Sequence, residues 1–211
     1  MPSSIYQLQD NADQIKALKS LADETRLLID NIIESSASAE VLKTAQATLQ
    51  TLNQTLGAER NNETAPRPLK HFNFSAAIKN TQEVLPYSPV SGHFNPIAPP
   101  ANIHFDTTQK KTFATVTCSR AYEGPPGMVH GAVIAGIYDQ LLALTSTCHG
   151  KAGPTAYLNT QFLQPTLLYQ ELTFSAWIER SEGRKVYIKG QCEVAGTIIS
   201  TADALCIEHR G

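Results

Sequence analysis

The sequence predicts an α+β fold in which a curved antiparallel β-sheet wraps around one long central helix, with a helical hairpin ahead of the sheet. The first observation is a segment at about residues 128–146 that is apolar nearly all round. As a helix it has no polar face, so it must be buried nearly all round. The second is a series of β-like segments after residue 100 in which apolar and polar residues alternate. One helix enclosed by such a sheet accounts for both observations.

The amino-terminal part of the chain, residues 5–56, is predicted to form two helices. Apolar residues recur there at steps of three and four on either side of an interruption at residues 35–38. Ser38 is suited to cap the second helix, and Gly57 is suited to end it. We therefore assign residues 1–57 to a helical hairpin, whose expected role is packing on its own domain or oligomerisation.

The middle of the chain separates the hairpin from the sheet. Residues 58–68 have almost nothing to bury and are predicted to be a linker. Residues 69–211 are assigned to the sheet domain, with its core at about 100–211. A short helix is expected within 69–85, and the Pro- and Gly-rich stretch 87–101 is expected to be an irregular loop. The predicted strands span 101–106, 112–121, 155–164, 171–181, 185–195 and 197–208.

Composition excludes several classes of protein. A net charge of -2 disfavours a nucleic-acid partner. No apolar run reaches the ~18 residues of a membrane span, and the amino terminus has no secretory signal pattern, so a cytoplasmic location is expected. The cysteines form no CxxC pair and have no His at ligand spacing, which predicts reduced, mostly buried thiols and no metal site: Cys118, Cys148, Cys192 and Cys206. Motifs for nucleotide, zinc-protease and serine-hydrolase chemistry are absent, and no cofactor is expected.

Asp139 is an acidic residue within the apolar central helix. An ionised carboxylate in an apolar setting costs several kcal/mol unless it is paired. One interpretation is that Asp139 is held there as a base or nucleophile. The other is that it meets solvent at a gap in the packing, or bonds to a neighbouring strand.

The entry to this helix, GPPGMVHGAV at 124–133, is rich in proline and glycine. The first N–H groups of a helix have no internal acceptor, and Gly131 has no side chain to shield its own. Such a donor can stabilise an oxyanion, although the same residues also suit an ordinary turn. His130 is suited to orient the turn, to act as an acid, or simply to pack.

These segments together resemble the hot dog fold thioesterases of the PaaI-like and THEM-like branch. The resemblance is carried by YEGPPGMVHGAVIAGIYDQ at 122–140, TAYLNTQFLQPTLL at 155–168 and SEGRKVYIKGQCEVAGTIISTADALCI at 181–207. The family usually has HGG where this chain has His130, Gly131 and Ala132. The resemblance implies a hot dog domain that hydrolyses acyl-CoA-type thioesters, and it leaves out the hairpin.

By this resemblance the catalytic and substrate-binding residues receive roles. Gly131 matches the residue whose amide polarises the thioester carbonyl, and Asp139 matches the catalytic carboxylate. Thr155 matches the threonine that supports the carboxylate or its water, and Asn159 matches a polar strand position near the site. A basic pair matches the hairpin that contacts the CoA phosphates, unless it is simply a charged β-turn: Arg184 and Lys185.

The spacing of Gly131 and Asp139 implies that two chains build the site. Eight positions of an α-helix span ~12 Å, whereas the attacking group must lie ~3 Å from the carbonyl carbon. Two antiparallel helices bring the Gly131 of one chain beside the Asp139 of the other, as the family's dimer does. We therefore expect a homodimer or a dimer of dimers that acts on acyl-CoA.

Two other functions compete with this prediction. A hot dog hydratase would need a catalytic Asp/His pair on one loop ahead of the helix, and we find no such pair. A non-catalytic acyl-CoA-binding sensor would use the helical hairpin as its interaction module. Retention of both Gly131 and Asp139 favours the enzyme, because binding alone does not require the carboxylate.

Overall fold

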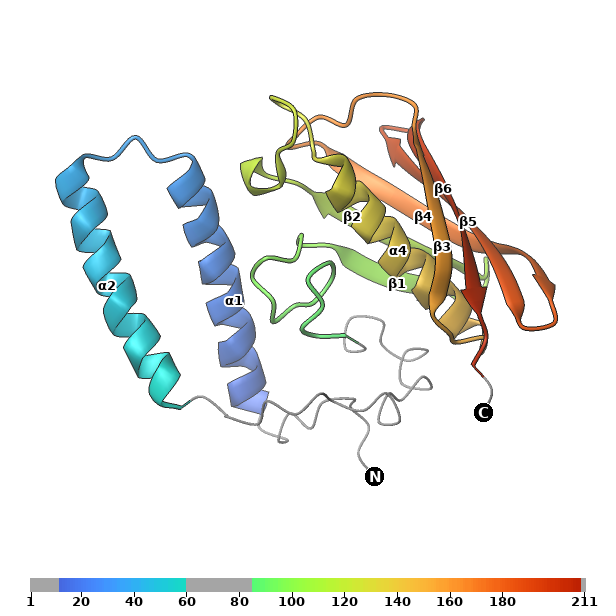
Figure 1. The fold of residues 1–211 in the computed structure, drawn as a ribbon, viewed down its shortest axis with the longest axis horizontal. Coiled ribbons are helices and arrows are strands. Elements are labelled where there is room, and N and C mark those ends of the chain that lie inside the picture. The colour runs from blue at the N-terminus through green and yellow to red at the C-terminus, as the bar shows by residue number, and fades with distance from the viewer. Residues whose placement is uncertain (1–11, 60–84, 210–211) are drawn as a thin grey trace.

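The computed structural model describes residues 12–59 and 85–209, and its sheet domain has the predicted α+β architecture (Figure 1). A six-stranded antiparallel sheet has the strand order β1-β2-β4-β5-β6-β3. Every predicted strand is confirmed: β1 (Asn102–Asp106), β2 (Lys111–Thr117), β3 (Thr155–Phe162), β4 (Glu171–Glu182), β5 (Lys185–Val194) and β6 (Thr197–Ile207).

The second strand is shorter than predicted. It ends at Thr117 rather than continuing to residue 121. The chain instead turns into a 3-10 helix, η2 (Arg120–Tyr122), which is closed by the Glu123 N–H donating to the Arg120 carbonyl. Alternation of apolar and polar residues does not distinguish this turn from a further strand residue.

The sheet has two tight hairpins and three bulged ladders, including the β3–β6 ladder between Thr155 and Tyr157. The β5–β6 hairpin turns through Ala195 and Gly196, whose φ angles are 49° and 79°. The β4–β5 ladder shifts register between Ile178 and Arg180, and the β5–β6 ladder shifts after Cys192. Bulges of this kind increase local twist and bend a sheet.

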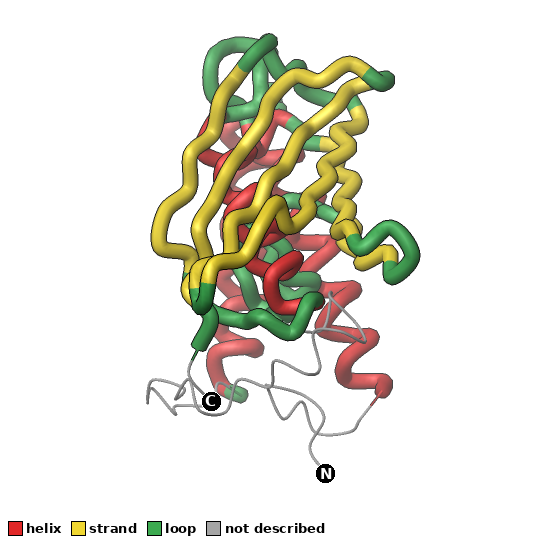
Figure 2. The backbone as a smooth tube through the Cα atoms, turned by 90° about the vertical axis from the view of Figure 1, so that its right-hand side faces the viewer, coloured by secondary structure: helices red, strands yellow, loops and turns green. Residues whose placement is uncertain are grey.

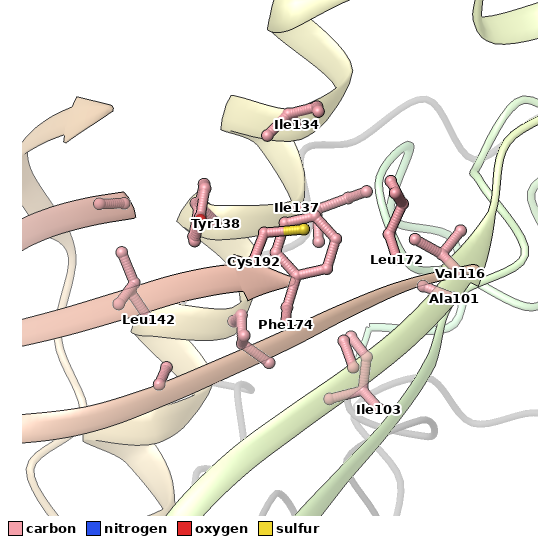
Figure 3. Close-up of a cluster of buried hydrophobic side chains, with 14 of the residues drawn as sticks. Ala101, Ile103, Val116, Ile134, Ile137, Tyr138, Leu142, Leu172, Phe174 and Cys192 are labelled. Carbon is pink, nitrogen blue, oxygen red and sulfur yellow. The ribbon is translucent and has the colours of Figure 1, made fainter. Parts of the chain in front are cut away.

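The central helix, α4 (Gly131–Cys148), lies in the concave side of the sheet (Figures 1 and 2). Its inner face is fully buried, with Tyr138 packed edge-on against Phe174 at 5.1 Å between ring centroids. The Tyr138 hydroxyl lies 2.9 Å from the Ser200 carbonyl, which satisfies the one polar atom of this ring. Figure 3 shows these side chains among the apolar residues that join α4 to the sheet.

The helix begins later than the sequence predicts. Met128 and Val129 are not helical but form isolated β-bridges with Leu167 and Glu123. A tight turn replaces the first predicted turn of helix, because Gly127 has a φ of 77°. The helix therefore starts at Gly131, which becomes its first residue.

The prediction that α4 is buried nearly all round is wrong for one strip of its surface. Ala132 and Asp139 are exposed, and Ala135, Gly136 and Ala143 are only half-buried. We call these five residues the open strip of α4. The sheet ends at β3, the strand at its edge, so no strand of the described chain reaches around to cover the strip.

Two helices precede the domain, α1 (Ala12–Ile33) and α2 (Ala39–Ala58). Ser38 caps α2 as predicted, accepting a hydrogen bond from the Val41 N–H. Gly57 does not end α2 but lies in its last turn. The predicted linker lies outside the described residues apart from its first two positions, and the predicted short helix lies outside them except for residue 85.

The two helices differ in how they meet the rest of the chain. On α1, Asp30 accepts a hydrogen bond from the Ser119 hydroxyl at 2.7 Å, and Glu34, directly after the helix, accepts one from Tyr169. On α2, every residue is exposed except Leu49, which is half-buried. Within the described residues α1 is therefore the helix that is attached to the sheet domain (Figure 1).

Candidate functional site

The turn that leads into α4 is fixed from two sides. Within the turn, the His130 N–H donates to the Tyr122 carbonyl at 2.8 Å. The loop between β3 and β4 holds the turn from outside. The Val129 N–H donates to the Thr166 carbonyl, and the Leu168 N–H donates to the Gly127 carbonyl. Preorganised donors contribute most to catalysis when their positions are held before the substrate arrives. The hydrogen bonds of this turn therefore hold the backbone of Gly131, the first residue of α4, in a fixed position.

His130 is the N-cap of α4, and its ring accepts a backbone hydrogen bond. Its Nδ1 lies 3.0 Å from the Ala132 nitrogen, so Nδ1 is the acceptor and Nε2 carries the proton of the neutral ring. Of the three roles considered for His130, orientation of the turn is the one that this bond supports. The cap occupies the Ala132 N–H and leaves the neighbouring Gly131 N–H without a partner among the described residues.

Gly131 lies where a side chain would crowd the end of β3. A Cβ at this position would come within 3.2 Å of the Phe162 ring. Phe162 is itself 53% exposed, so its ring covers Gly131 without burying it. Phe162 was not predicted as a site residue. Its place as the apolar residue at the end of the alternating segment TAYLNTQF was the one signal in the sequence that could have identified it.

Asp139 lies on the open strip, in contact with solvent in the single chain. Of the two interpretations of Asp139, the exposure agrees with the one in which the carboxylate meets solvent at a gap in the packing. The strip is open because β3 is an edge strand, so Asp139 needs no buried partner within its own chain.

Thr155 and Asp139 both affect the pKa of one buried thiol, that of Cys206. Burial raises the pKa of Cys206, the Thr155 hydroxyl partly offsets this by hydrogen bonding to the sulfur, and the negative charge of Asp139 raises it further. Thr155 is the first residue of β3 and pairs with Cys206 across the ladder. The structure therefore brings Thr155 and Asp139 to the same region of the molecule.

Gly131 and Asp139 do not meet within one chain. They are eight positions apart on one continuous helix, or ~12 Å along its axis. No single carbonyl group can contact the N–H of one and the carboxylate of the other at hydrogen-bonding distance.

Asn159 lies on the other face of the sheet. Its amide donates to the Asp203 carboxylate at 3.0 Å. Because Ala202 and Ala204 on either side of Asp203 are core residues, Asp203 and its partner Asn159 point away from α4. Within one chain the structure does not bring Asn159 together with Gly131 or Asp139.

Arg184 and Lys185 lie at the β4–β5 hairpin. Arg184 donates from Nε to the Glu208 carbonyl at 2.8 Å, and Lys185 is exposed and opposite Ile207 of β6. The Ile207 N–H in turn donates to the Pro154 carbonyl, directly before Thr155. The basic pair is thus at the Thr155 end of the sheet, and the guanidinium keeps further donors available.

No group of three or more His, Cys, Asp or Glu side chains in residues 12–59 and 85–209 is arranged to hold a metal ion. All four cysteines are buried, as predicted, and none of them forms a disulfide. Over the same ranges, no helix has the length and apolarity that crossing a membrane requires.

Comparisons with known proteins agree on one family. The family model described as "Thioesterase superfamily" matches residues 126–198. The chain is 32% identical to the acyl-coenzyme A thioesterase THEM4 of Bos taurus over 104 residues, or 47% of this chain and 42% of that protein. The mouse THEM4 is 29% identical over 110 residues, or 49% of this chain and 46% of that protein. The chain thus matches less than half of the length of these relatives.

A crystal structure of the thioesterase superfamily protein RHA08564 is similar over almost the whole chain. It superimposes with a TM-score of 0.77 at 28% sequence identity. The match covers 90% of both chains, so it extends well beyond the sheet domain.

Proposed function

The sheet domain of this chain is a hot dog domain of the thioesterase superfamily, and from that premise we propose that the chain hydrolyses an acyl-CoA thioester to the free acid and CoA. The observation that carries the proposal is the pair on α4: an unpaired Gly131 N–H on a rigid turn, and an exposed carboxylate at Asp139. One group is suited to stabilise developing negative charge on the thioester oxygen. The other is suited to attack, or to activate water.

The active unit we propose is a homodimer that pairs two copies of α4 in antiparallel orientation. The open strip and the outer edge of β3 are uncovered in the described chain. Large apolar side chains are exposed at the end of β3 and just after it: Phe162 at 53% and Leu163 at 55%. A second copy that covers these residues also places its Asp139 beside Gly131, which gives two shared sites related by a two-fold axis. A dimer of dimers is compatible with the same interface.

In the proposed reaction the thioester carbonyl accepts a hydrogen bond from the Gly131 N–H. Asp139 of the other chain either attacks the carbonyl carbon to give a mixed anhydride, or takes a proton from the water that attacks. Collapse of the tetrahedral intermediate breaks the C–S bond and releases the CoA thiolate, which takes up a proton. On the anhydride route, water then hydrolyses the anhydride to the free acid and restores the Asp139 carboxylate. Thr155 then supports the carboxylate or its water, and His130 keeps the oxyanion donor in place through its cap.

The remaining assigned residues receive roles in substrate binding. Arg184 and Lys185 are proposed to contact the CoA phosphates, because both are basic, exposed and near the Thr155 end of the sheet. Asn159 stays a candidate only for contacts made on the outer face of the sheet, where its amide already bonds to Asp203.

The direct test is release of free thiol from a panel of acyl-CoA substrates by the full chain. We expect at least one substrate to be hydrolysed, with full activity after treatment with a chelator. A strict requirement for added metal would contradict the mechanism, and absence of thiol release across the panel would contradict the function.

A complementation experiment tests the shared site. Asp139→Ala and Gly131→Val each inactivate both sites of a homodimer, since valine blocks the approach of the carbonyl. A mixed dimer has both lesions in one site and an intact second site. After subunit exchange, random pairing should restore up to about a quarter of the wild-type activity. If exchange is demonstrated and no activity returns, the two residues act within one chain.

A second candidate is a non-catalytic acyl-CoA sensor, and one observation favours it. The apolar residues of α2 are exposed, including Val41, Leu42, Leu52 and Leu56, as expected of an interaction module. Binding of acyl-CoA without thiol release, unaffected by Asp139→Asn, would support the sensor over the enzyme.

A further inference from the structure

A single arginine of α1 donates hydrogen bonds to four backbone carbonyl groups of one loop. The Arg26 guanidinium donates to the carbonyls of Ala98 at 3.2 Å, Gly92 at 3.3 Å, His93 at 3.2 Å and Asn95 at 2.9 Å. The side chain is only 14% exposed. Five donors in a planar fork suit arginine to such a cluster of acceptors, whereas lysine has three donors at one point. Arg26 therefore fixes the loop at 86–98 to α1.

The same loop cannot easily change its shape. A Cβ at Gly92 would lie 2.5 Å from the Pro86 carbonyl oxygen and 2.5 Å from the Ser88 nitrogen, so the backbone closes on itself there. The Phe94 N–H donates back to the Pro86 carbonyl at 2.9 Å. The loop is thus a rigid unit, which Arg26 positions as a whole.

The opposite side of this loop lies against α4. The Val90 methyl groups are 3.5 and 3.6 Å from the position that a Cβ on Gly136 would occupy, which is ordinary van der Waals contact. Ser88 Oγ lies 3.3 Å from the Gln140 side-chain oxygen. These contacts place the loop beside Gly136 of the open strip and beside Gln140, the residue after Asp139, while β3 borders the other side of α4 through Phe162 at Gly131.

We propose that Val90 is a specificity-determining residue of the thioesterase site, and that Arg26 is the positioning residue that holds it against α4. The inference rests on the proposed function. In the proposed dimer, an acyl chain whose carbonyl is bound at Gly131 runs between the two copies of α4, along the open strip, because the opposite face of α4 is filled by core side chains. Val90 is the apolar side chain that the loop presents at the edge of this strip, over Gly136. Its size therefore limits the length and width of the acyl chain that the site accepts.

The experiment measures the ratio of kcat/KM for a long and a short straight-chain acyl-CoA, in the full chain. Val90→Ala should raise this ratio and Val90→Leu should lower it, each by about tenfold, because a methylene in an apolar pocket changes discrimination by ~10- to 200-fold. Arg26→Ala should broaden the selectivity, and Arg26→Lys should recover it only in part. Lys16→Ala, an exposed change on the same helix, is the matched control and should leave the ratio unchanged.

The outcomes separate this inference from the proposed function. If the wild-type chain hydrolyses no acyl-CoA, the function fails and the inference fails with it. If the wild-type chain is active, and folded Val90→Ala and Val90→Leu both keep the wild-type ratio, the inference alone is wrong. If Arg26→Ala lowers all rates equally without changing the ratio, Arg26 stabilises the protein and does not position the specificity residue. Opposite shifts of the ratio in the two Val90 variants support the proposal.

Discussion

Tyr138 and Asp139 are consecutive residues of α4, but they lie on faces with opposite roles. Tyr138 is completely buried, and its hydroxyl bonds to Ser200. Asp139 is exposed on the open strip. The ~100° between consecutive side chains of a helix is enough to separate a face that holds the sheet from a face that is free for chemistry. Because one face is packed in the core and the other is exposed, changes on the first should affect stability and changes on the second should affect activity.

The largest effect is expected on the open face. Asp139→Asn keeps the size of the side chain but removes the base or nucleophile, so kcat/KM should fall by roughly 10²- to 10⁴-fold. The melting temperature should be nearly unchanged, because the side chain is exposed in the single chain. Steady-state kinetics and thermal denaturation measure the two quantities, and wild-type rates in this variant would refute the catalytic assignment.

On the buried face, Leu141→Ala should lower the free energy of unfolding by ~2–5 kcal/mol, since it leaves a cavity between α4 and the sheet. Leu141 has no exposed surface. Denaturant unfolding measures this loss, and the remaining folded protein should keep its activity per active dimer. A loss of activity without a loss of stability would show that the two faces are not independent.

Tyr138→Phe makes the comparison sharper, because it removes one atom from the buried face. The ring packing against Phe174 remains, but the hydrogen bonds to Ser200 are lost. Loss of these buried hydrogen bonds should cost ~1–3 kcal/mol of unfolding free energy. Comparison with Leu141→Ala by the same unfolding assay separates loss of a hydrogen bond from loss of packing.

His130→Ala tests the N-terminus of α4, where the helix cap and the Gly131 N–H lie next to each other. Loss of the cap on the Ala132 N–H should cost ~0.5–2 kcal/mol of stability and should also lower kcat, because the entry turn loosens around the Gly131 donor. His130→Asn provides the control, since asparagine is a good N-cap. Recovery of stability together with kcat in His130→Asn indicates a positioning role, whereas recovery of stability alone indicates that the imidazole also takes part in the reaction.

The smallest effect is expected at the β4–β5 hairpin, away from both faces. Arg184→Ala with Lys185→Ala should raise KM for acyl-CoA by up to about tenfold, as exposed ion pairs contribute ~0.2–1 kcal/mol each. KM for a short pantetheine thioester should not change, because that substrate lacks the nucleotide phosphates. Equal increases for the two substrates would mean that the pair does not contact those phosphates.

Much of the fold was predictable from local patterns. Alternation of apolar and polar residues located all six strands, and the uniformly apolar segment located α4, since periodicity depends only on which residues are adjacent. The cap at Ser38 was predictable for the same reason. Gly131 and Asp139 were also found from the sequence, through the composition of the helix and the resemblance it carries.

What the tertiary structure decided is where each of these residues faces and what lies next to it. The exposure of Asp139 follows from β3 being the edge of the sheet, and strand order is a long-range property that no local pattern encodes. The outward orientation of Asn159 depends on its register with β6, and the helix start at Gly131 depends on bridges to the distant loop at 166–168. The attachment of Arg26 to the loop that carries Val90 joins residues more than sixty positions apart. The sequence determined the elements and named the candidate residues, whereas packing between distant segments determined which of those candidates lie close together.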